Sequence, residues 1–144
     1  MPILNYTTSI DAHKTVTELQ MLLSKKGARK VLLEYNEQGQ PTALMFEILL
    51  NGESLQYRLP CRHRQVHKIL LNERSVERRY KTEQHALKVG WRIIKTWIEA
   101  QFALVESQQA EMAEVFFPYA LTKSGETVYE QIVRTRYLLE DKGE

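Results

Sequence analysis

The stretch KVLLEYNEQGQPTALMFEILLNGESLQYRLP, residues 30–60, predicts three strands separated by two turns. The first turn signal is NEQG at 36–39. The second is Asn51-Gly52, whose residues both tolerate the positive φ angles of a type I′ turn. Apolar residues recur at every second position in the second and third runs, as in strands that bury one face. The stretch therefore predicts an antiparallel three-stranded meander whose apolar face must be covered by helices.

Helical patterns flank this meander on both sides. Residues 9–26 carry an apolar stripe at spacings of three and four, with Thr8 or Ser9 as the N-cap and Gly27 as the stop. Beyond Pro60 the apolar spacing is helical throughout. It predicts a short helix around 66–70 that ends near 72, a long helix from 82, capped by Thr82, to 118, and a C-terminal helix over 127–139.

These elements predict an α+β fold in a single domain, residues 1–144. Residues 1–60 form its α/β half, and residues 61–144 form its helical half. A short strand at 3–7 is expected to join the edge of the sheet. We therefore expect an N-terminal helix, a meander covered by helices, a long helix and a shorter C-terminal helix.

The long predicted helix is apolar on two faces, which is unusual for a helix on a small sheet. One stripe consists of Val89, Ile93, Trp97 and Leu104. The other consists of Trp91, Ile94, Ile98 and Val105. Either the C-terminal helix or another subunit should cover the second stripe, so its four residues are candidate interface residues.

The composition is that of a soluble globular protein. The chain has 144 residues, of which 43% are hydrophobic and 26% are charged, and no apolar run approaches the ~20 residues of a membrane-spanning helix. The N-terminus lacks the pattern of a secretory signal, and the single cysteine excludes an intramolecular disulfide. We therefore expect a cytoplasmic protein with no membrane partner.

Positive charge is concentrated in residues 61–81, CRHRQVHKILLNERSVERRYK. This segment contains seven Arg or Lys and two acids, in a chain whose formal net charge is only +2. Such a surface attracts anionic partners, and each phosphate that it neutralises releases counterions. The predicted phosphate ligands are Arg62, Arg64, Lys68, Arg74, Arg78, Arg79 and Lys81. Tyr80 and His67 lie among these cations and are expected to stack on bases. The competing interpretations are a solvated helix face and a surface for an acidic protein.

Two further interpretations of the chain remain open at this stage. The order helix, three strands, helix is also that of double-stranded RNA-binding domains, whose basic run can be compared with residues 62–68. However, the chain continues for about 80 residues that such a domain does not need. Cys61, His63 and His67, with His85 or Glu73 as a fourth ligand, form a candidate metal site, but the neighbouring arginines oppose a cation.

The sequence contains no motif of a known enzyme class. Cys61 is a candidate nucleophile because the adjacent Arg62 would lower its pKa, but nothing marks His63 as a positioned base. The motifs G-x-S-x-G, Walker A and G-x-G-x-x-G are all missing. We therefore predict a protein without enzymatic activity, cofactor or metal.

Three segments resemble small uncharacterised proteins of bacterial phages and integrated mobile elements. They are LPC at 59–61, WRIIKTWIEAQFALVE at 91–106 and FFPYAL at 116–121. The resemblance extends over most of the chain but includes no catalytic signature. It implies a phage or mobile element as the source and the cytoplasm of a bacterial host as the location.

Two functional hypotheses follow. The first is a small non-enzymatic nucleic-acid-binding protein that contacts phosphates through the basic segment, with the type of nucleic acid left open. The alternative is a protein-interaction module, either self-assembling into a homo-oligomer or binding a host protein through the two-faced long helix.

Overall fold

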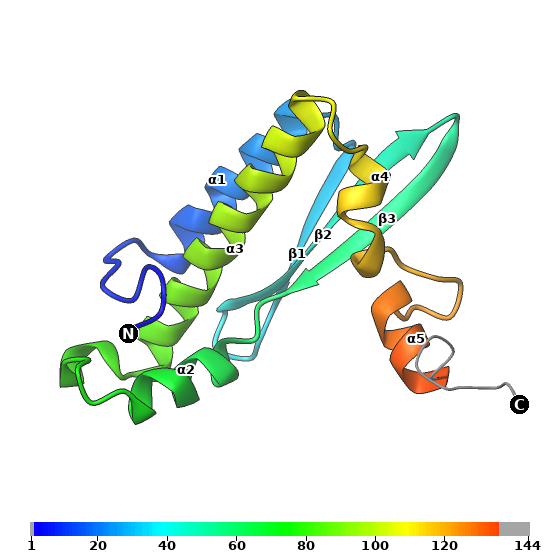
Figure 1. Cartoon of the computed structure of the whole chain (residues 1–144). Helices are drawn as coiled ribbons and strands as arrows, with labels where there is room; N and C mark the ends of the chain where they lie inside the picture. Colours follow the sequence, from blue (N-terminus) through cyan, green and yellow to red (C-terminus); the bar gives the residue numbers. More distant parts are fainter. Residues whose placement is uncertain (1, 136–144) are drawn as a thin grey trace, which may run out of the picture.

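The computed structural model describes residues 2–135 and has the predicted α+β fold (Figure 1). The elements, in chain order, are α1 (Ala12–Lys25), β1 (Lys30–Tyr35), β2 (Pro41–Leu50), β3 (Glu53–Pro60), α2 (His63–Asn72), η1 (Arg78–Tyr80), α3 (Glu83–Glu106), α4 (Met112–Val115), η2 (Phe117–Tyr119) and α5 (Val128–Thr135). The predicted C-terminal helix at 127–139 corresponds to α5, and residues 136–139 lie outside the described part.

The sheet is the antiparallel meander that the sequence predicts, in the order β1-β2-β3. Phe46 in β2 lies opposite Val31 in β1 and Tyr57 in β3, so these three side chains share one face. Asn51 and Gly52 have φ angles of 54° and 84°, as a type I′ turn requires. The predicted strand at 3–7 is not formed; these residues make a turn, and Tyr6 packs near α3 instead.

Helices α1 and α3 lie side by side across one face of the sheet (Figure 1). Helix α1 starts later than predicted, because Asp11 rather than Thr8 or Ser9 caps it: Asp11 Oδ1 accepts a hydrogen bond of 3.0 Å from the amide of His13. Thr82 caps α3 as predicted, through a 3.0 Å bond from the amide of His85.

The long helix ends at Glu106, twelve residues before the predicted boundary. Gln108 adopts a φ of 64°, and a capping box between Glu111 and Glu114 starts the separate helix α4. The break has a packing reason: an uninterrupted helix would run past the small sheet. The turn instead returns Phe116 to the core, where its ring lies 5.3 Å from that of Phe46 and is fully buried.

The chain itself buries Trp91 and Ile98 of the second stripe, so the interface prediction is wrong for these two residues. Both are fully buried in the main core, and the Trp91 indole N–H donates a 2.9 Å hydrogen bond to the carbonyl of Pro41. Ile94 and Val105 are half-buried. The sheet side of the main core, rather than α5, covers Trp91 and Ile98. The cover by α2 and the loop after it lies on the other stripe: Leu70 and Val76 pack on Ala86 and Val89 of α3 in a separate small core.

The other face of the sheet carries a mixture of polar and apolar side chains. Arg58 donates two hydrogen bonds, of 2.8 and 2.9 Å, to the carboxylate of Glu34 on the strand two places away. Glu47 accepts hydrogen bonds from Ser54 at 2.6 Å and Gln56 at 3.3 Å. Leu32, which shares this face, is 58% exposed.

Acid should weaken the fold through these two carboxylates. The Arg58 guanidinium holds the pKa of Glu34 below its ordinary value of 4.5, and the Ser54 and Gln56 donors do the same for Glu47. The stability that they add is complete above pH 4.5 and is lost as the pH falls through the lower folded-state pKa values. Urea unfolding at a series of pH values should show this decline, and Glu34→Gln should make it shallower. An equally steep decline in that variant would contradict the assignment.

Gly90 marks the closest approach of α3 to the segment that leads into α2. A Cβ at this position would lie 2.8 Å from the Sγ of Cys61, which is too close for unstrained contact. We predict that Gly90→Ala destabilises the protein by about 1 kcal/mol, because overpacking outweighs the gain in helix propensity. In a Cys61→Ala background the same change should stabilise it by up to about 1 kcal/mol, because only the propensity gain remains. Urea titrations of the four proteins measure this coupling, and simple additivity would show that the contact has no energetic effect.

Candidate nucleic-acid interface

The basic segment, residues 61–81, forms one end of the molecule, opposite the β2–β3 turn (Figure 1). The side of this segment that faces α3 is held by packing and by a polar contact. Leu70 of α2 and Val76 in the following loop are buried against α3, and His67 Nε2 lies 2.8 Å from the carbonyl oxygen of Lys81. The outer side of the segment is therefore presented on a rigid base.

The cations of this segment are exposed and mostly unpaired. Arg62, Arg64, Lys68, Arg74, Arg78 and Arg79 are exposed, and Lys81 is half-buried. Within residues 2–135, only Arg79 of this set forms an ion pair, at 3.3 Å from the exposed carboxylate of Glu77. Among residues 2–135, five exposed cations of this set, Arg62, Arg64, Lys68, Arg74 and Arg78, therefore form no ion pair, and Lys81 interacts electrostatically with Glu73.

Helix geometry places these cations along α2 and the loop that follows it. Arg64 and Lys68 are four residues apart and share the outer face of α2, which is about 15 Å long. Arg62 precedes the helix at its N-cap, and Arg74 to Arg79 follow its C-terminal end. Ile69 and Leu71 are half exposed between these charges. The cations therefore lie along α2 and on the loop after it, which returns to His67, with some apolar surface between them.

Tyr80 and His67 do not offer the free rings that the sequence suggested. The guanidinium carbon of Arg79 lies 4.7 Å from the centre of the Tyr80 ring, and Tyr6 and His85 lie against the same ring at 5.8 and 5.0 Å. His67 is held by the Lys81 carbonyl. Tyr80 is therefore half-buried against the small core, and the stacking role predicted for it stays a prediction.

The residues considered for metal binding or nucleophilic catalysis have separate partners. Cys61 is buried, and burial raises the pKa of its thiol to about 12. His63 lies 3.4 Å from Glu83, and His85 lies 2.6 Å from the carbonyl oxygen of Tyr6. Within the described part of the chain, no three His, Cys, Asp or Glu side chains are grouped to hold a metal ion.

A small hollow beside Arg62 was not predicted. Its volume is about 150 Å³, and it is lined by Arg58, Pro60, Arg62, Pro118, Tyr119, Thr127, Tyr129 and Glu130. These residues come from β3, the start of α2, η2 and the start of α5, and the two farthest apart in the sequence, Arg58 and Glu130, are separated by 72 positions. The only local signal for them is the pattern T-x-x-E at 127–130, which marks the start of a helix but not a cavity.

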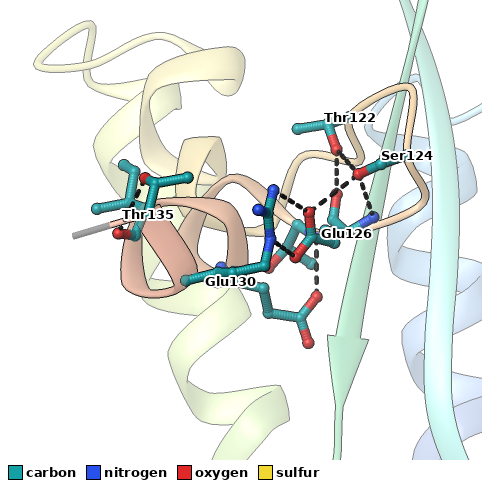
Figure 2. A network of polar contacts seen from close by, with 8 residues as sticks. Thr122, Ser124, Glu126, Glu130 and Thr135 are labelled. Atoms are coloured by element: carbon teal, nitrogen blue, oxygen red, sulfur yellow. Dashed lines mark hydrogen bonds and ion pairs between the residues drawn. The ribbon is translucent and has the colours of Figure 1, made fainter. Parts of the chain in front are cut away.

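Hydrogen bonds make the α5 side of this hollow rigid (Figure 2). Thr127 and Glu130 cap α5 reciprocally: the Thr127 amide donates to Glu130 Oε1 at 2.8 Å, and the Glu130 amide donates to Thr127 Oγ1 at 3.1 Å. Arg134 donates two bonds of 2.9 Å to Glu126, which closes the loop before the helix. Tyr129 lies between these fixed points and is 56% exposed.

Cys61 should be unreactive in the native protein. A thiol pKa of about 12, against an ordinary value of 9.0, leaves about a thousandth of the usual thiolate. We predict that Ellman's reagent labels the folded protein far more slowly than the urea-unfolded protein. Equal rates in the two states would instead place the thiol at an accessible, activated site.

The comparisons find no protein-family model, no curated protein and no solved structure that matches this chain. Within residues 2–135, no helix has both the length and the hydropathy to cross a membrane. The function must therefore be argued from the geometry described above.

Proposed function

We propose that this protein is a small non-enzymatic nucleic-acid-binding protein that contacts phosphates through α2 and the loop up to Lys81. The observation that carries the proposal is that the exposed cations of this segment, Arg79 excepted, form no ion pair among the described residues. In an ordinary solvated surface, opposite charges are interspersed. Here seven cations and two acids occupy one end of the molecule.

The rigid base of the segment supports this function. Because Leu70 and Val76 hold the α2–η1 segment against α3, the backbone that carries the cations needs little ordering when a ligand binds. Arg64 and Lys68 lie on one face, so two phosphates of the same backbone can be contacted together. The resemblance of the sequence to phage and mobile-element proteins agrees with an accessory role in handling nucleic acid in a bacterial cytoplasm.

The interaction-module hypothesis ranks second. It depended on a free apolar face of α3, and two of its four residues, Trp91 and Ile98, are fully buried in the chain's own core. Ile94 and Val105 remain half-buried. A homo-oligomer or a complex with a host protein would have to use another surface.

Binding should depend steeply on salt and on the α2 cations. We predict that fluorescence anisotropy with labelled oligonucleotides, at salt concentrations between about 50 and 200 mM, shows a linear fall of log affinity with log salt. Arg64→Gln with Lys68→Gln should reduce the slope by about 1.4 for a single strand or 1.8 for a duplex, because two phosphate contacts are lost. Neither side chain has a polar partner among the described residues, so the fold should be unaffected.

The matched control is Lys25→Gln with Lys123→Gln. Both lysines are exposed, lie outside the basic segment and form no ion pair within the described chain, and the net charge changes by the same amount. The control should keep the full slope. If both double variants lose affinity equally, net charge rather than this segment governs binding, and absence of binding at low salt would refute the proposal.

A further inference from the structure

The hollow beside Arg62 suggests which nucleic acid is bound. Arg62 lines the hollow and is also the first cation of the basic segment, so the two surfaces are continuous. Resting on the proposed function, we propose that this hollow accepts one unpaired nucleobase and that the protein therefore binds single-stranded nucleic acid. The phosphates next to this base would lie against Arg62 and Arg64.

The size of the hollow suits one base. A cavity of about 150 Å³ holds a single six-membered ring, as an apolar protein cavity of that size holds benzene. It is too small for a whole nucleotide. Two tyrosine rings and two prolines provide flat apolar walls, and aromatic side chains stack on bases of any sequence. Tyr129 contributes an exposed side chain to this wall.

The charges around the hollow favour a neutral ring over a phosphate. The Arg58 guanidinium is paired with Glu34, at 2.8 and 2.9 Å, and it also interacts electrostatically with Glu130. Glu130 places a carboxylate at the hollow, which offsets the attraction of Arg62 for a phosphate there. One Glu130 oxygen accepts from the Thr127 amide, and the other has no hydrogen-bond partner in residues 2–135. The free oxygen can accept from an exocyclic amine, and Arg62 can donate to a ring nitrogen or carbonyl.

Only an unpaired base can enter such a hollow. In a duplex the bases are stacked and paired, and extruding one costs a few kcal/mol. In a single strand the base is free, and the cations along α2 can follow the backbone on either side. The same chemistry is offered by DNA and RNA, so the test includes both.

The test measures the affinity of the whole protein for labelled oligo(dC), oligo(rC) and a mixed-sequence duplex, each of about twelve nucleotides or base pairs. The variants are Tyr129→Ala, Tyr129→Phe and, as a matched control, Tyr35→Ala. Tyr35 is 53% exposed against 56% for Tyr129, and it lies on β1, outside the hollow. Far-ultraviolet circular dichroism and thermal melting verify that each variant is folded.

We expect the wild-type protein to prefer the single strands to the duplex. Tyr129→Ala should weaken single-strand binding by at least about five-fold, because one base loses its stacking partner, with the salt slope unchanged. Tyr129→Phe should keep nearly full affinity, because the ring remains, and Tyr35→Ala should have no effect. The ratio of DNA to RNA affinity then identifies the preferred backbone.

Two results would overturn the inference in distinguishable ways. Salt-dependent binding that Tyr129→Ala leaves unchanged, or weakens equally for strand and duplex, removes the nucleobase site but leaves the proposed function intact. Absence of binding to every oligonucleotide at low salt removes both.

Discussion

The structure depends on α3 being packed on both sides at once. Toward the sheet, Trp91 is fully buried and its indole N–H is hydrogen-bonded to the Pro41 carbonyl. On another side, Ala86 and Val89 pack against Leu70 of α2 and Val76 of the following loop. A helix with apolar residues nearly all round must be covered nearly all round, and this chain supplies both covers itself. This double burial fixes α3 between the sheet and α2.

The second cover determines how the charge is displayed. Because one face of α2 buries Leu70 and packs Val66 on the small core, the opposite face, with Arg64 and Lys68, is exposed to solvent. Several carboxylates of α1, α3 and the sheet are paired elsewhere: Glu18 with Arg92, Glu99 with Lys95, and Glu34 with Arg58. The arrangement that completes the core thus also leaves one end of the molecule strongly positive. The packing of α2 on α3 thus determines which of its charged side chains are exposed.

The break after Glu106 has a similar double consequence. It returns Phe116 to the core and then leads the chain along the edge of β3. There the Leu121 amide donates a 2.7 Å hydrogen bond to the carbonyl oxygen of Gln56. That path places α5 beside Arg58 and Arg62 and forms the hollow that we assign to a nucleobase. The α5 residues there are positioned by capping and by the Glu126–Arg134 pair rather than by a large core.

The sequence by itself determined the elements whose cause is local. The period-two pattern and the Asn51-Gly52 turn define the meander, Thr82 caps α3, and the excess of arginines over 61–81 is visible in the letters. Such signals need only a few neighbouring residues. They were sufficient for the α+β fold and for the location of the basic segment.

Only the tertiary structure decided which surfaces are free. Trp91 and Ile98 have the spacing of an interface stripe but are buried, and Tyr80 sits among the cations but packs on Tyr6 and His85. Conversely, Tyr129 and Glu130 carry no local sign of a site and meet Arg62 only because the chain turns after Glu106. Burial and cavities depend on contacts between residues tens of positions apart, and a pattern of neighbouring residues does not contain that information.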